Sequence, residues 1–142
     1  MSQDSVAASE KALAIMGQRG LGALADSMGI ILLELSAEKS VATMPVAGNT
    51  QPLGLLHGGA HVVLAESLGS FAANVHAYPD SYAVGIELNA SHHSSITEGL
   101  VTGTCIAIKL GKTLTTHEIT MRAEDGRLLS TVRITNYIRA KN

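Results

Sequence analysis

A single acidic residue stands in the longest apolar stretch of the sequence, and its type and position suit a catalytic carboxylate. The stretch from Gly58 to about His76 contains no proline and is rich in Ala, Leu and Val, which predicts a helix of about five turns. Glu66 is its only acidic residue. An acidic side chain among small and apolar residues is an outlier that needs an explanation. The simpler interpretation is a solvated residue on an exposed helix face.

Two glycines mark the expected start of this helix. Gly58 and Gly59 follow His57, and the first backbone N–H groups of a helix have no acceptor within it. These donors carry the positive end of the helix dipole, and no side chain obstructs approach at a glycine. An oxyanion or a phosphate is therefore a candidate ligand, although close backbone packing at a tight turn also explains the two glycines.

The spacing of these two features has a consequence for assembly. Glu66 lies eight residues beyond Gly58, which is roughly 12 Å along a helix. One ligand atom cannot contact both groups at that distance. If the Gly58 N–H and the Glu66 carboxylate act on one carbonyl, they come from different subunits whose central helices run antiparallel. The spacing thus predicts a shared site at a dimer interface.

The predicted helix has one bulky face and one face of small residues. Helical spacing directs the bulky residues toward a core and leaves room beside the carboxylate. The expected packing face comprises Ala60, Leu64, Leu68, Phe71 and Val75, and the expected open face comprises Gly59, Val62, Glu66, Gly69, Ser70 and Ala73.

The rest of the chain predicts strands joined by tight turns around this helix. Asp125-Gly126 is a strong hairpin signal, and apolar residues alternate with smaller or polar ones from Tyr82 onward. This order predicts an α+β fold with an antiparallel sheet. The expected elements are a helix at Ser5–Met16, a hairpin of Gly29–Leu35 and Lys39–Val46, and strands at Tyr82–His93, Leu100–Leu110, Thr113–Ala123 and Arg127–Ile138.

The amino-acid composition limits the kinds of partner that the protein is expected to bind. The chain has 142 residues, 15% of them charged and 46% hydrophobic, with a net charge of -2. Without a basic excess, nucleic acid is not an expected partner. An average domain carries about 25% charged residues, so part of this surface is expected to be covered by further copies of the chain. The composition predicts a homo-oligomer.

Other classes of protein are disfavoured by absent signals. No apolar run is long enough to span a membrane, and the first residues do not resemble a secretory signal, so we expect a cytoplasmic protein. Cys105 is the only cysteine, which excludes an internal disulfide. We expect it to be a small buried apolar residue.

The motifs together resemble those of a known family, the hotdog-fold acyl-CoA thioesterases. This family includes the phenylacetate-pathway, 4-hydroxybenzoyl-CoA and 1,4-dihydroxy-2-naphthoyl-CoA thioesterases. The resemblance runs from about Met28 to Arg139 and centres on Gln51, His57-Gly58-Gly59 and Ala65-Glu66-Ser67, with Glu66 nine residues after His57. The segment Val84–Ala90 and the turns Glu98-Gly99 and Asp125-Gly126-Arg127 also match.

The resemblance implies a fold, an activity and an assembly. The fold is one hotdog domain over residues 1–142, with residues 1–20 as an N-terminal helical segment. The implied reaction is hydrolysis of an aromatic or a short- to medium-chain acyl-CoA without a cofactor. Active sites are implied between paired subunits, often in a dimer of dimers.

The resemblance also implies roles for individual residues. Glu66 matches the catalytic carboxylate, which acts either as a nucleophile or as a general base for water, and the Gly58 N–H matches the oxyanion donor. Gln51 and His57 match residues that position the thioester, and Ser70 matches a hydroxyl that orients water or the leaving group. Without the resemblance, Gln51 is equally well a loop-capping amide and Ser70 a helix-packing residue.

Binding of the substrate and its CoA moiety is implied for further positions. Ser94 departs from relatives that carry an arginine there, which implies weaker or rerouted nucleotide binding. Lys112 is equally well an ordinary turn lysine. The implied positions are Gly59, Gly85, His92, Ser94, Ser95, Gly111 and Lys112.

Other kinds of function remain open from the sequence. A zinc hydrolase would use His57, His61, His92 and His93, but adjacent strand residues point to opposite faces, so no metal site is expected. A non-catalytic acyl-CoA-binding hotdog protein would not need Glu66, and a hydratase-like one would carry a different His/Asp arrangement. His61, His76 and His117 are expected to be structural or surface residues.

Overall fold

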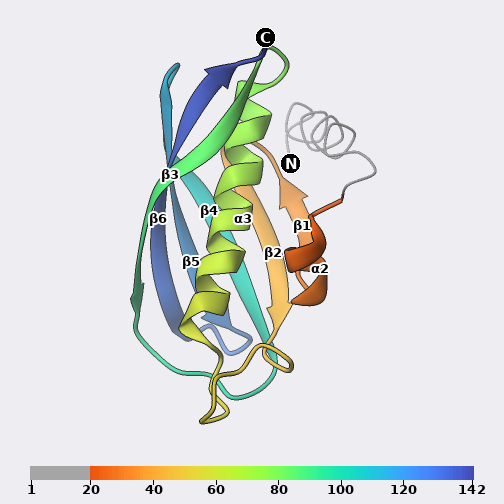
Figure 1. The fold of residues 1–142 in the computed structure, drawn as a ribbon. Coiled ribbons are helices and arrows are strands. Elements are labelled where there is room, and N and C mark those ends of the chain that lie inside the picture. The colour runs from red at the N-terminus through yellow and green to blue at the C-terminus, as the bar shows by residue number, and fades with distance from the viewer. Residues whose placement is uncertain (1–19) are drawn as a thin grey trace.

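A long helix lies along the concave side of a curved antiparallel sheet (Figure 1). The computed structural model describes residues 20–142, and the helix expected at Ser5–Met16 lies outside them. The α+β prediction is confirmed, and the expected strands form with small shifts at their ends. The elements are α2 (Ala23–Ser27), β1 (Ile31–Leu35), β2 (Lys39–Pro45), α3 (Gly58–Ala77), β3 (Ser81–His92), β4 (Leu100–Leu110), β5 (Leu114–Ala123) and β6 (Leu128–Ala140).

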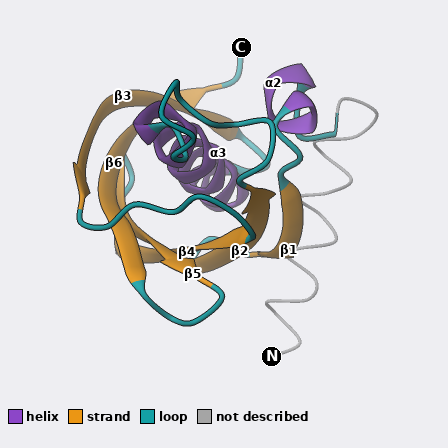
Figure 2. Cartoon of the chain, turned by 90° about the horizontal axis from the view of Figure 1, so that it is seen from below, coloured by secondary structure: helices purple, strands orange, loops and turns teal. Residues whose placement is uncertain are grey.

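The six strands form one sheet in the order β1-β2-β4-β5-β6-β3. Seen along α3, the sheet curls around the helix (Figure 2). The strand β3 follows α3 in sequence but joins the far edge of the sheet, where it pairs only with β6. It has a register shift between Gly85 and Glu87. One whole side of β3 is therefore an unpaired edge within a single chain.

Local sequence signals explain where α3 begins and ends. The Nδ1 atom of His57 accepts a hydrogen bond from the Gly59 N–H at 2.8 Å, which caps the helix. At the other end, Pro79 keeps Tyr78 in an extended conformation, and the helix stops at Ala77. The helix bounds agree closely with the expected Gly58 to about His76.

The helix packs on part of the expected face, because Ala60, Leu64 and Leu68 are buried as predicted, but the buried surface also extends onto the face of small residues. Gly69 and Ala73 are buried, whereas Phe71 and Val75 are only partly buried. A Cβ atom added at Gly69 would lie 2.4 Å from the Ile134 side chain. The small residues therefore do not leave an open face: they let α3 approach β6 closely, and the predicted face assignment was wrong on this point.

The core between α3 and the sheet is apolar and contains the lone cysteine. Leu64 and Leu68 of α3 pack with Met44, Ile119 and other buried side chains of the strands. Cys105 is fully buried, and burial raises the pKa of its thiol to about 12. The expectation of a buried apolar role for Cys105 is confirmed.

Two further features belong to the fold. The short helix α2, which the sequence analysis did not predict, lies beside α3 and contributes Ala25 to the core. Within residues 20–142, no helix is both long enough and apolar enough to cross a membrane.

Candidate active site at the start of the central helix

The first turn of α3 holds one free backbone donor. The Gly59 N–H is bonded to the His57 side chain, and the Ala60 N–H is bonded to the His57 carbonyl at 2.9 Å. Among the described residues, nothing accepts a hydrogen bond from the Gly58 N–H. Of the two glycines that the sequence analysis singled out, Gly58 is thus the one whose backbone N–H is available to a ligand.

The loop before α3 is built around Gln51. Its side-chain oxygen accepts a hydrogen bond from the Leu53 N–H, and its backbone N–H donates to the Leu55 carbonyl at 2.8 Å. The loop is tied to the rest of the fold by the His57 N–H, which donates to the Asn49 carbonyl. The Gln51 oxygen therefore shapes the loop, and the Nε2 group is left for a ligand.

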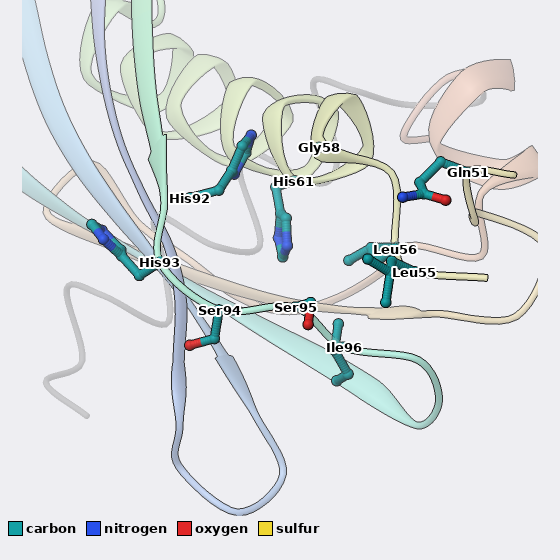
Figure 3. Close-up of a pocket in the computed structure, with 10 residues that line it drawn as sticks. All are labelled: Gln51, Leu55, Leu56, Gly58, His61, His92, His93, Ser94, Ser95 and Ile96. Atoms are coloured by element: carbon teal, nitrogen blue, oxygen red, sulfur yellow. The ribbon is translucent and has the colours of Figure 1, made fainter. Parts of the chain in front are cut away.

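A pocket of about 340 Å³ opens beside Gly58 (Figure 3). Leu55, Leu56 and Ile96 are its apolar side chains, and its other side chains are polar. Among residues 20–142, no Lys, Arg, Asp or Glu side chain contributes to its wall. Its lining residues are Gln51, Leu55, Leu56, Gly58, His61, His92, His93, Ser94, Ser95 and Ile96.

His61 points from the first turn of α3 into this pocket (Figure 3). Only 4% of the residue is exposed, and its Nδ1 atom is buried without a hydrogen-bond partner. Burial, helped by the nearby His92, lowers the pKa of His61 from 6.5 to about 4. The ring is therefore uncharged at neutral pH.

His92 faces the same pocket from the end of β3. Its ring centroid is 5.4 Å from that of His61. The Ser130 hydroxyl donates its proton to the Ser91 carbonyl at 3.1 Å, so at 2.9 Å it must accept from the Nδ1–H of His92. Nε2 is therefore the ring nitrogen of His92 that is left for a ligand, and this atom lies beside Gly58.

Glu66 lies elsewhere, two turns further along α3. Its side chain is exposed in the single chain. A Cβ atom added at Gly85 of β3 would lie 3.5 Å from Glu66 Oε1 and 3.6 Å from Asn136 Oδ1. The absence of a side chain at Gly85 therefore leaves a notch that the carboxylate and the amide both border.

Asn136 is an unusual neighbour for this carboxylate. It is fully buried, and neither its Oδ1 nor its Nδ2 atom has a hydrogen-bond partner. Thr115, which is paired with it across β5 and β6, also has a buried hydroxyl without a partner. Such unpaired polar groups are costly in a core, and the Asn136 amide lies close to the Glu66 carboxylate, across Gly85.

The structure thus divides the predicted residues among three places. Gln51, Gly58, His92, Ser94 and Ser95 line one pocket, and His57 and Gly59 cap the helix beside it. Glu66 and Gly85 adjoin each other at mid-helix, with Ser70 one turn further along α3.

Gly111 and Lys112 form the third place, at the opposite end of α3. The His76 Nε2 atom is hydrogen-bonded to the Gly111 carbonyl at 2.8 Å. Within a single chain, Gly111 and Lys112 therefore lie far from the Gly58 pocket.

Sequence reasoning missed two residues of this region. His61 was expected to be structural or superficial, but it lines the pocket. Its position four residues after the helix cap was the available signal, since the first turn faces whatever binds at the helix start. Asn136 carried no local signal, because only the fold brings β6 beneath Glu66.

Comparisons with known proteins identify the family to which the chain belongs. The sequence pattern of the Thioesterase superfamily matches residues 53–130. The chain belongs to the Thioesterase superfamily. It is also 38% identical over 127 residues to the proofreading thioesterase EntH of Cronobacter sakazakii, covering 89% of this chain and 93% of that protein.

Solved structures place this thioesterase among hotdog proteins. A mutant thioesterase from Pseudomonas aeruginosa has a TM-score of 0.81 and 36% identity, covering 93% of this chain and 94% of that one. A thioesterase from Haemophilus influenzae has a TM-score of 0.81 and 30% identity, covering 92% and 90%. The hotdog fold is confirmed, and the chain is a thioester hydrolase, which disfavours the non-catalytic alternative.

Proposed function

We propose that this thioesterase hydrolyses acyl-CoA, with the free Gly58 N–H as the oxyanion donor and Glu66 as the catalytic carboxylate. In the reaction, the carbon–sulfur bond of the thioester breaks, water supplies an oxygen to the acyl carbon, and the products are a carboxylate and a thiol. The single observation that carries the proposal is the unpaired Gly58 N–H beside a pocket. Such a donor stabilises the developing negative charge on the thioester oxygen.

The two groups belong to different subunits in this proposal. Along one helix they are roughly 12 Å apart, so an antiparallel partner helix has to supply the second group. The family usually forms oligomers, and the unpaired edge of β3 supports pairing there. Tyr82, Val84 and Ile86 of β3 are exposed in the single chain, and a partner would bury them.

The same pairing also gives the third group of residues a role. In an antiparallel dimer, the C-terminal end of one α3 approaches the N-terminal end of the other. Gly111 and Lys112 of one chain then lie near the other chain's pocket, where the ammonium group can bind a CoA phosphate. Exposed Ile106 and Ile108 on β4 support a further contact between dimers.

The remaining site residues position the substrate. The free Gln51 amide and the His57 Nε2–H are donors next to Gly58, and the Ser70 hydroxyl is one turn from Glu66. Leu55, Leu56 and Ile96 give the pocket an apolar wall, which suits an aromatic or a short- to medium-chain acyl group. The reaction consumes only water and needs no cofactor.

Thiol release from a panel of acyl-CoA thioesters tests this proposal. We expect turnover by the wild type and a loss of several orders of magnitude in kcat for Glu66→Gln, with the oligomer unchanged in light scattering. Glu118→Gln is the matched control, because Glu118 is an exposed carboxylate on β5, and it should retain full activity. Equal turnover by the wild type and Glu66→Gln would contradict the assignment of Glu66 as the catalytic carboxylate.

A single-turnover reaction in ¹⁸O-labelled water separates the two roles of Glu66. If the carboxylate is the nucleophile, it forms an anhydride with the acyl group and expels the thiolate; water that opens this anhydride at its glutamyl carbon leaves ¹⁸O in Glu66, and label there demonstrates the nucleophilic role. If it is a general base, the label appears only in the released acid. Mass spectrometry of the peptide that contains Glu66 reports which occurs.

A further inference from the structure

His61 is the one polar side chain of the pocket that is buried and has no partner in the fold. Its ring projects into the pocket beside Gly58 (Figure 3). Its Nδ1 atom is buried and unpaired, and no hydrogen bond to Nε2 is present among the described residues. By contrast, His92 is anchored by Ser130, and His93 is bonded to Thr131 at 2.9 Å.

A buried imidazole without a hydrogen-bond partner destabilises the fold unless a ligand bonds to it. Leaving a buried polar group without a partner costs free energy, and a pocket lining is where a ligand can supply that partner. At neutral pH the His61 ring is uncharged, because burial lowers its pKa to about 4. It then offers one N–H donor and one nitrogen acceptor, which match a hydroxyl or an amide.

The rest of the wall favours the same kind of ligand. In the part of the chain that the structure describes, no Lys or Arg lines the pocket to neutralise an anion. The bare Nε2 of His92 adds a second acceptor 5.4 Å away, measured between ring centroids. The apolar wall accommodates the carbon skeleton that carries the polar group.

We propose that this pocket is a subsite for an uncharged hydroxyl or amide of the thioester substrate, and that His61 is the residue that selects for it. The inference rests on the proposed function, in which the thioester carbonyl binds the Gly58 N–H. A group a few bonds from that carbonyl reaches His61, because both residues belong to the first turn of α3 and line the same pocket. Two parts of an acyl-CoA carry such a group: a hydroxylated acyl chain, and the first amide of the thiol arm.

Two pairs of substrates distinguish these sources. The first pair is 4-hydroxybenzoyl-CoA and benzoyl-CoA, which differ only in the acyl hydroxyl. The second pair is the N-acetylcysteamine and butyl thioesters of benzoate, of which only the first has the amide. The ratio of kcat/KM within each pair measures what the polar group contributes, and a general loss of activity cancels from it.

We expect a preference of about 10-fold for the polar member of one pair, as for one buried hydrogen bond between uncharged groups. His61→Phe should reduce that ratio to about 1, and His61→Asn, which keeps a donor and an acceptor, should restore part of it. His117→Gln is the matched control, since His117 is buried outside the pocket, and its ratio should equal that of the wild type. Ratios that His61→Phe leaves unchanged in both pairs would overturn the proposal.

Binding measurements test the role of His61 independently of the proposed catalysis. Phenacyl and 4-hydroxyphenacyl thioethers of CoA, and phenacyl thioethers of N-acetylcysteamine and butanethiol, cannot be hydrolysed. Calorimetry should show the same preference in the wild type and its loss in His61→Phe. If hydrolysis fails but this preference is present, only the catalytic assignment falls. If the two proteins bind both members of each pair with equal ratios, the role of His61 is excluded.

Discussion

The two ends of α3 each hold a pair of histidines, and the pairs differ in what their nitrogens contact. At the N-terminal end, His61 and His92 face a pocket, and His61 has no partner in the fold. At the C-terminal end, the ring of His76 is bonded to the Gly111 carbonyl, and that of His117 to the Ala37 carbonyl at 2.8 Å. The second pair ties loops to the fold, whereas in the first pair the His61 ring and the Nε2 atom of His92 are left for a ligand.

Burial alone therefore does not separate a structural histidine from a functional one. Burial lowers the pKa of both His61 and His117. What differs is the surroundings: His117 bonds a backbone carbonyl within the core, while His61 borders a pocket next to a free N–H. The site assignment depends on this difference, and the following experiments test it.

Among the experiments that compare the two ends of α3, the largest effect is expected from removing the Gly58 N–H. Proline is tolerated at the first residue of a helix, and His57 already has the extended conformation that a following proline requires (φ -63, ψ 133). Gly58→Pro should therefore preserve the helix and lower kcat by about 100- to 1,000-fold, as for loss of an oxyanion donor. Steady-state thiol release measures the effect.

Gly58→Ala is the control for this substitution. Either residue introduces a Cβ atom that would lie 2.8 Å from His92 Nε2, so the His92 ring has to move in both variants. Only alanine retains the N–H. Equal losses in the two variants would show that crowding, and not the missing donor, lowers the rate.

A second effect concerns stability in acid. The pKa of His61 is about 4 in the folded chain and about 6.5 when unfolded, so the unfolded state binds more protons between these values. Stability is then fully present above pH 6.5 and is lost as the pH falls toward 4, by on the order of 3 kcal/mol from this residue. Urea unfolding at a series of pH values measures the loss.

Substitutions of individual histidines show which of them cause this loss of stability in acid. His61→Phe should show a smaller loss between pH 6.5 and 4 than the wild type, and His117→Gln should change in the same direction. His93→Gln, at an exposed ring, should follow the wild type. Identical pH profiles for the wild type and His61→Phe would contradict a buried, uncharged His61.

The smallest expected effect is at the C-terminal end of α3. His117→Leu removes the donor to the Ala37 carbonyl and should lower the free energy of unfolding by about 1 kcal/mol. His117→Gln can keep that hydrogen bond and should lose less. Thiol release should be unchanged in both variants, and a selective fall in kcat would show that this end of the helix contributes to the chemistry.

Local signals in the sequence predicted most of the fold. The long proline-free stretch predicted α3, and turn residues such as Asp125-Gly126 separated the strands of the sheet. These features depend on backbone preference and on the period of apolar residues, which are properties of neighbouring residues. The predicted site could also be proposed from local motifs, because His57-Gly58-Gly59 at a helix start provides backbone donors by itself.

Contacts between distant segments were not predictable in this way. Gly69 and Ala73 looked like part of an open face, but Ile134 of β6 lies against Gly69, and Ala73 is buried as well. Periodicity says which residues share a face and not what covers it. For the same reason His61 looked unremarkable until the end of β3 placed His92 beside it.

The sequence by itself determined the helix, the strands and the separation of Gly58 from Glu66, since rise per residue and backbone preference act over short distances. The tertiary structure decided which N–H stays free, which histidine faces a pocket and which carboxylate lies near Gly85. Hydrogen-bond partners and burial depend on segments far apart in the chain, and only folding brings those segments together.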